Sequence, residues 1–272
     1  MQGITVANKD HCQFIQFAAF KQDNRIVHGF TTRVGGISQQ PYAELNMALH
    51  VGDNPGHVQA NRRIACQALG MPHQDLVAAV QVHGNRVQVV GPEHRGRGAV
   101  DYSTALPDTD ALITNSPGVP LSSYYADCVP ILYYDPVKKC VGLAHAGWRG
   151  TVQRIASETV RQMELAFGCN PGDILVGIGP SIGPCCYQVD EPVQQVVVSR
   201  FKQWRELLKP AGVGHWKLHL WETNRQALLE AAIKPENITL AGLCTVCHND
   251  MFFSHRAEKG KTGRMASLIM IK

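Results

Sequence analysis

The sequence predicts a mixed-sheet α/β (α+β) domain, and three observations lead to that prediction. Segments rich in Val, Ile and Tyr and bounded by Gly or Pro recur through the middle of the chain, as expected for strands. Segments of helical periodicity occur among them, without the regular alternation that produces an all-parallel sheet. The 272 residues contain no repeat, low-complexity stretch or Ser/Gly linker, so we expect one domain over residues 1–272.

Strands are predicted, in order, at residues 76–82, 87–90, 111–114, 121–125, 130–134, 141–145 and 174–178. The clearest helix follows Gly150 and ends at Gly168, with one apolar face made of Val152, Ile155, Ala156, Thr159, Val160, Met163 and Phe167. Weaker helical patterns cover residues 57–69, 192–208 and 221–232.

Composition excludes several classes of protein. The 26 Lys and Arg residues exceed the 22 Asp and Glu residues by four and form no basic block, so no nucleic-acid partner is expected. The apolar runs fall far short of the roughly 20 residues that span a bilayer, and no clean signal-peptide region precedes residue 20. We therefore expect a cytoplasmic protein without a membrane partner, whose nine cysteines are reduced.

Two motifs match a known functional pattern only in part. The G-x-S-x-G pattern at residues 179–183 resembles a nucleophile elbow, but no helical period follows at once, so Ser181 is interpreted as a turn residue. Cys244 and Cys247 form a C-x-x-C that could join Cys185 and Cys186 around zinc. A structural zinc ribbon usually has two such knuckles, so free thiols are the favoured interpretation.

Three potential metal ligands lie at or near predicted strand ends: His83 in Q-V-H-G, Cys128 in A-D-C-V-P and His145 in H-A-G-W-R-G. If neighbouring strands bring them together, two imidazoles and a thiolate would leave one tetrahedral position open, as in a catalytic zinc site. The spacing leaves a plainer alternative, in which the histidines are hydrogen-bonded surface residues and Cys128 fills the core.

Arg149 adds a possible anion site beside His145. Residues 147–151 lead into the clearest helix, whose first N–H groups and dipole would attract a phosphate, and the Arg149 guanidinium could bind its oxygens. The alternative is an ordinary surface arginine beside a glycine-rich turn.

These segments together resemble one known family. The matching motifs are F-T-T-R-V-G-G-I-S (30–38), L-N (45–46), G-D-N-P (52–55), Q-V-H-G (81–84), D-T-D-A-L (108–112), A-D-C-V-P (126–130), H-A-G-W-R-G (145–150), G-P-S-I-G-P (179–184) and a tail from F-F-S-H-R (252–256) to T-G-R (262–264). In this order they resemble the bacterial laccase-domain family, also called polyphenol oxidase-like or peptidoglycan editing factor, whose members are purine nucleoside phosphorylases. The resemblance runs from about residue 27 to residue 272.

The resemblance implies specific residues and chemistry. The family's zinc ligands fall on His83, Cys128 and His145, and none is replaced. The implied activity is phosphorolysis of adenosine, inosine, guanosine and methylthioadenosine, with deamination of adenosine as a second activity. The implied fold is a single domain of mixed β-sheets packed as a sandwich flanked by helices, similar to a deamidating toxin domain with a Cys–His nucleophilic pair.

Further residues are candidates within the matching segments. The candidates for substrate contact are Arg149, Arg33, Asn46, Arg256 and Arg264, and the alternative for each is an ordinary surface role. Asp127 or Asp110 could act as acid, base or ligand-orienting group, or could instead cap a turn. Trp148, Tyr187 or Phe252 could stack on a purine, although core packing is the commoner role of an aromatic residue.

Four hypotheses therefore remain open. The first is a zinc-dependent phosphorylase and deaminase with purine nucleosides and phosphate as its partners. The second is a hydrolase with Cys128 as its nucleophile, for which nucleotide-linked peptidoglycan precursors are candidate substrates. The third is a laccase-like polyphenol oxidase with copper, which the Irving–Williams order allows to replace zinc. The fourth is a non-catalytic zinc-binding or scaffolding protein. A monomer or a homodimer is compatible with each.

Overall fold

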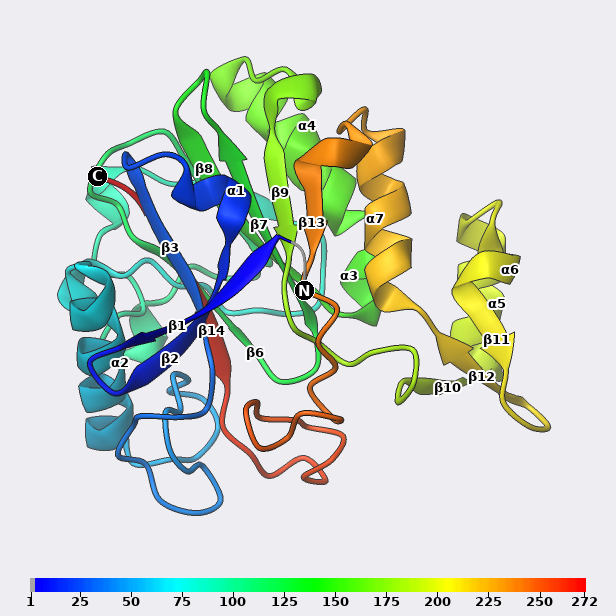
Figure 1. The fold of residues 1–272 in the computed structure, drawn as a ribbon, viewed down its shortest axis with the longest axis horizontal. Coiled ribbons are helices and arrows are strands. Elements are labelled where there is room, and N and C mark those ends of the chain that lie inside the picture. Colours follow the sequence, from blue (N-terminus) through cyan, green and yellow to red (C-terminus); the bar gives the residue numbers. More distant parts are fainter. Residues whose placement is uncertain (1–2) are drawn as a thin grey trace.

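The computed structural model describes residues 3–272 and has a layered α/β architecture built on two large sheets (Figure 1). One sheet has the strand order β1-β2-β3-β14-β6, and the other has the order β13-β9-β7-β8-β5-β4. A third sheet, β10-β12-β11, lies beside α5 and α6 at the right of Figure 1. The mixed α/β fold predicted from the sequence is confirmed.

The first sheet contains β1 (Ile4–Lys9), β2 (Cys12–Phe17), β3 (Ile26–Thr31), β6 (Leu121–Tyr125) and β14 (Met265–Ile271). The second contains β4 (Val87–Val89), β5 (Ala111–Thr114), β7 (Val129–Asp135), β8 (Cys140–Ala146), β9 (Leu175–Ile178) and β13 (Ile238–Leu240). The small sheet contains β10 (Gln188–Asp190), β11 (Leu208–Pro210) and β12 (His215–Leu218). The helices are α1 (Ala18–Lys21), α2 (Pro55–Leu69), α3 (Trp148–Val152), α4 (Ile155–Phe167), α5 (Glu191–Arg200), α6 (Trp204–Leu207) and α7 (Leu220–Glu230).

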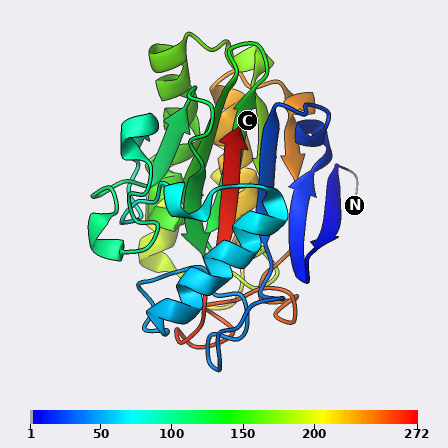
Figure 2. The ribbon, with the colours of Figure 1, turned by 90° about the vertical axis from the view of Figure 1, so that its left-hand side faces the viewer.

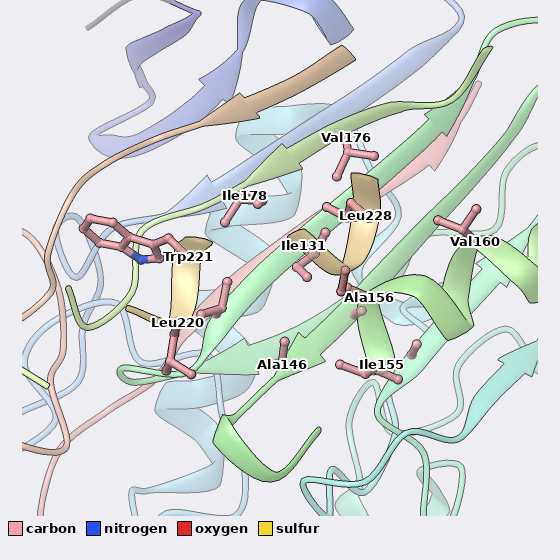
Figure 3. Packing of buried hydrophobic residues seen from close by; sticks show 14 of the residues in the cluster. Ile131, Ala146, Ile155, Ala156, Val160, Val176, Ile178, Leu220, Trp221 and Leu228 are labelled. Atoms are coloured by element: carbon pink, nitrogen blue, oxygen red, sulfur yellow. The ribbon is translucent and has the colours of Figure 1, made fainter. Parts of the chain in front are cut away.

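Strand β7 shows how the layers are held together. Successive side chains of a strand point to opposite faces, so Leu132 and Tyr134 pack toward the five-stranded sheet. Ile131 and Tyr133 face the helices instead and join the cluster that contains α4 and α7, part of which is seen in Figure 3. Both faces of β7 are buried, as its run of seven buried residues requires.

Helix α2 covers the outer face of the five-stranded sheet, in front of β14 (Figure 2). Its Ala65 and Leu69 pack in the same cluster as Phe14 of β2 and Leu268 of β14. Asn54 caps the helix by accepting the Gly56 N–H, and Gly70 ends it in the left-handed conformation. Burial of each large apolar side chain stabilises this packing by roughly 1.5–3 kcal/mol.

The sequence prediction was most accurate in the central sheet. Strands β5 and β6 have the predicted bounds. The ends of β4, β7, β8 and β9 differ from the predicted ends by no more than one residue. The predicted strand 76–82 was wrong. Residues 76–79 are buried, but Val77 and Ala79 form only isolated bridges. The N–H groups of the segment bond to neighbouring loops, for example that of Val77 to the carbonyl of Pro120. The N-terminal strands β1 to β3 and the strands β10 to β14 were not predicted.

Two predicted helices are interrupted. The helix expected after Gly150 divides into α3 and α4 because Arg154 adopts a left-handed conformation, with its guanidinium paired with Glu230 and stacked on Phe201. The predicted apolar face of α4 and its end at Gly168 are confirmed. The predicted helix 192–208 is likewise split, because Phe201 is extended and buried.

Within residues 3–272, no helix has the length and apolar character needed to cross a bilayer.

Buried His28 on β3 makes stability depend on pH. Its Nε2 accepts the Phe17 N–H at 2.9 Å, and burial, aided by Lys21 and Lys9, lowers its pKa to about 3. Since the unfolded chain has the higher pKa, stability is complete above about pH 6.5 and declines as the pH falls toward 3. We expect His28 to account for about 2 kcal/mol of stability lost between pH 7 and pH 5.

Urea unfolding at pH 7 and pH 5 measures this loss. His28→Gln, whose amide oxygen can accept the same N–H, should show a smaller decline between the two pH values than the parent. Exposed His215→Gln serves as the control and should leave the decline unchanged. An equal decline in the His28 variant and the parent would contradict the assignment.

Candidate metal centre

His83, Cys128 and His145 converge in space. Each offers one ligand atom, and the three atoms lie within 4.8 Å of one another. Cys128 immediately precedes β7 and His145 lies near the end of β8, and the antiparallel register places Pro130 opposite His145. His83 comes from the loop after the extended segment 76–82, where its backbone has a φ of 62°. The predicted convergence of three distant segments is therefore present.

Asp110 organises two of these ligands. Its carboxylate accepts the backbone N–H of His83 at 3.0 Å and that of Gly84 at 2.7 Å, and so fixes the loop. It also lies 2.8 Å from Nδ1 of His145. Because the carboxylate is an acceptor, Nδ1 carries the proton and leaves Nε2 free to bind an ion. Asp110 thus occupies the orienting position proposed for it from sequence.

Gly147 makes room for the cluster. A Cβ at this position would lie 2.5 Å from Cδ2 of His83 and 3.3 Å from Sγ of Cys128. The glycine of H-A-G-W-R-G is therefore required for the close approach of the two ligands rather than for a special backbone conformation.

The donor set of the cluster suits a borderline metal ion. Burial raises the pKa of the Cys128 thiol, but His145 and His83 lower it by more, to about 6. Burial lowers the pKa of His145, whereas Cys128 and Asp110 raise it, to about 9. Without an ion the two groups therefore form a thiolate–imidazolium pair, and an ion that binds would displace the proton on Nε2 of His145. One thiolate and two neutral imidazoles are then a donor set suited to zinc, copper and other borderline metals.

A cavity of about 480 Å³ opens at the three ligands. It is lined by His50, Gln81, His83, Tyr124, Ala126, Asp127, Cys128, His145, Ile182, Tyr187, His255, Arg256 and Arg264. This volume lies within the range of small-molecule sites. The lining includes two arginines and one aspartate, so the cavity is suited to an anionic guest.

Asp127 holds one wall of the cavity in place. Its backbone has a φ of 84°, and its carboxylate accepts the Thr245 hydroxyl at 2.6 Å and the Arg256 backbone N–H at 2.7 Å. The Arg256 guanidinium lies over the ring of Tyr187. Arg256, Arg264 and Tyr187 are sequence-predicted candidates that the structure brings to the cavity.

Other candidates lie outside the lining. Asn46 is fully buried and accepts the Arg264 backbone N–H at 2.9 Å, so it can position that arginine without touching a guest. Arg33 is bonded to the carbonyls of Ala43 and Asn249 and paired with Glu258. These partners engage its guanidinium, which faces a different surface hollow.

The structure does not have the two features on which the anion site at Arg149 was predicted, a long helix that begins beside it and an arginine that faces the candidate site. Arg149 is exposed, stacks on Trp148 and is absent from the cavity lining. The helix that begins here is the five-residue α3, since the long helix α4 starts only at Ile155. Trp148 also lies outside the lining, and Phe252 is a core residue.

Other residues that line the cavity were not predicted from the sequence, among them His50, Gln81, Tyr124, Ile182 and His255. Gln81, Ile182 and His255 lie within motifs that carried the resemblance, so their position in those motifs was an available signal. His50 and Tyr124 lie outside them, and no local pattern points to either residue.

Comparison with known proteins assigns the family. Residues 27–272 match the family model described as multi-copper polyphenol oxidoreductase laccase. The chain belongs to this laccase family. It is 43% identical over 257 residues to purine nucleoside phosphorylase YlmD of Bacillus subtilis, covering 94% of this chain and 92% of the relative. It is 44% identical over 248 residues to the YlmD of Geobacillus stearothermophilus, covering 89% of each.

Two solved structures agree with the fold. Bacillus licheniformis hypothetical protein YfiH has a TM-score of 0.93 at 40% identity, covering 98% of this chain and 97% of that one. Neisseria meningitidis protein NMB0706 has a TM-score of 0.79 at 29% identity, covering both chains completely at 100%. The resemblance recognised from sequence is confirmed.

The donor set distinguishes between one metal ion and several. Over residues 3–272, the His83, Cys128 and His145 group is the one set of clustered potential ligands that contains histidine. Three donors suit a single ion with an open position, whereas a multi-copper cluster needs further histidines nearby. The described residues therefore fit one ion and do not fit the multi-copper centre in the family's description.

Proposed function

We propose that this protein is a zinc-dependent purine nucleoside phosphorylase acting on adenosine, inosine, guanosine and methylthioadenosine, with adenosine deamination as a second activity. The observation that carries the proposal is the His83, Cys128 and His145 donor set at a cavity that also contains Arg256 and Arg264. The names of the YlmD relatives support the same substrate class.

The three ligands would hold the zinc ion, which when bound supplies a Lewis acid for phosphate or water. Asp110 keeps His145 in the tautomer that presents Nε2 to the ion, and it holds the His83 loop in place. Neither task requires Asp110 to move during turnover, so His145 and His83 are already in position before substrate binds.

Cleavage of an N-glycosidic bond creates positive charge on the ribose carbon and negative charge on the purine. Arg256 and Arg264 supply cationic groups for phosphate, which would attack the ribose carbon from one side. Tyr187 provides a ring against which a purine can stack. Asp127 has a hydrogen bond at each carboxylate oxygen, which suits it to positioning Arg256 better than to proton transfer.

Product analysis across a nucleoside panel, with and without phosphate, tests the proposal. We expect inosine to yield hypoxanthine and ribose 1-phosphate only when phosphate is present, because phosphate is the attacking group. Adenosine should also yield inosine without phosphate, because deamination uses water. Inosine without phosphate is the matched control, since it has no amino group to lose.

Two results would count against the proposal. Release of free ribose at the same rate with and without phosphate would indicate a hydrolase, and no turnover of any nucleoside by zinc-loaded protein would remove the proposal altogether.

A second candidate is a hydrolase with Cys128 as nucleophile, and its support is the closeness of the Cys128 sulfur to a ring nitrogen of His145, within 4.8 Å. Alkylation of Cys128 in metal-free protein separates the two candidates. The nucleophile hypothesis requires metal-free protein to be active before alkylation and inactive after it, whereas the zinc hypothesis requires it to be inactive before alkylation.

A further inference from the structure

A second group of potential metal ligands lies outside the candidate centre. Cys185, Cys186, Cys244 and Cys247 each offer a sulfur, and the four sulfurs lie within 4.8 Å of one another. Two come from the loop after β9 and two from the loop after β13, and a bridge between Ser181 and Cys244 joins these loops. The sequence left this set open as the alternative to free thiols, and the second pair comes from a neighbouring loop rather than from another C-x-x-C knuckle.

We propose that these four cysteines bind a structural zinc ion, distinct from the ion held by His83, Cys128 and His145. A closed set of four thiolates is a common structural zinc site, whereas the three-ligand centre has an open position. The two sites would therefore have different roles in the same chain.

The sulfur separations fit a shared ion. Sγ of Cys247 lies 3.6 Å from Sγ of Cys185 and 3.5 Å from Sγ of Cys186. Zinc–sulfur bonds of about 2.3 Å in a tetrahedron place the sulfurs about 3.8 Å apart. A disulfide requires about 2.05 Å and joins only two sulfurs, so Cys247 could bond to just one of its two neighbours.

A backbone donor from the other loop points at the most buried of the four sulfurs. Sγ of Cys244 accepts the Gly183 N–H at 3.2 Å. A donor of this kind stabilises a thiolate, the form that binds metal. Gly183 lies in the loop that carries Cys185 and Cys186, so the two loops are already joined at Cys244.

The position of the group indicates what such an ion would do. Tyr187 follows Cys186 directly and lines the substrate cavity. Thr245 lies inside the C-x-x-C and donates its hydroxyl to Asp127, which in turn accepts the Arg256 N–H. An ion that joins the two loops would therefore hold Tyr187 and the Asp127–Arg256 wall in place.

Metal analysis of protein purified under reducing conditions tests this proposal. We expect about two zinc ions per chain in the parent protein and about one in Cys128→Ala, because the four-thiolate site remains. The double variant Cys185→Ser/Cys247→Ser should also hold about one zinc ion per chain. The triple variant, which combines Cys128→Ala with these two changes, should hold none. Cys66→Ala, a buried thiol of α2 outside both groups, is the control and should retain two.

Cobalt(II) identifies the ligands independently of catalysis. Cys128→Ala loaded with cobalt should show thiolate-to-cobalt charge-transfer absorption, and the triple variant should lack it. If the double variant fails to fold, the rate at which a thiol reagent modifies Cys128→Ala before and after chelation gives the same information, since bound thiolates react slowly.

Three outcomes would overturn the inference. They are folded Cys128→Ala protein without metal, a double variant that retains both ions, and mass spectrometry showing disulfides among the four cysteines in reduced parent protein. Each is independent of nucleoside turnover, so failure of this inference can be distinguished from failure of the proposed activity.

Discussion

Replacing Cys128 with alanine is expected to lower kcat/KM for phosphorolysis of inosine by at least about 10³-fold. The variant loses the one thiolate among the three ligands, and His83 and His145 alone form a much weaker metal site. Initial rates at saturating phosphate measure the loss, and zinc content measured on the same sample shows whether activity and metal disappear together.

Cys66→Ala is the matched control, since it removes a buried thiol far along the chain and should retain parental activity and zinc. The loss in Cys128→Ala should persist when excess zinc is added, because the missing ligand cannot be replaced by mass action. Parental turnover in folded Cys128→Ala would contradict both the metal hypothesis and the nucleophile hypothesis.

Whether a strand could be predicted from its sequence depended on how the strand is buried. Strands β5, β6, β7 and β8 are buried on both faces and consist mostly of apolar and aromatic residues, so their composition identified them. Strand β1 is largely exposed and β2 includes two glutamines, so neither has a clear apolar pattern. The apolar segment 76–82 has strand composition, but its N–H groups bond to loops, and composition does not specify the partner.

The same limit applies to the site. The candidate metal ligands His83, Cys128 and His145 lie in distinctive motifs, so a resemblance carried by those motifs could bring out all three. Arg33 and Arg264 lie in equally well-matched segments, yet Glu258 and the carbonyl of Ala43 engage the first while the second reaches the cavity. Tertiary contacts decide which arginine lines the cavity, and no local sequence pattern contains that information.

Asp110→Asn should weaken zinc binding by about 10–100-fold and lower turnover in proportion at limiting zinc. Asp110 is 2% exposed, and its carboxylate serves His145 and the N–H groups of the His83 loop together. Burial raises the pKa of this carboxyl, but His145 and the loop N–H groups lower it below its ordinary value, so the native group is an anion with acceptors on both oxygens. An amide has one acceptor oxygen, so its NH₂ must face one of these donors.

Competition with a chelator measures the change in affinity, and kcat measured against zinc concentration separates positioning from chemistry. Because the substituted amide would touch neither substrate nor ion, excess zinc should restore most of kcat, unlike in Cys128→Ala. Asp135→Asn, at the far end of β7, removes another fully buried carboxylate and controls for lost stability. Unchanged zinc affinity in Asp110→Asn, or an equal loss in Asp135→Asn, would show that Asp110 supports the fold and does not position the ligands.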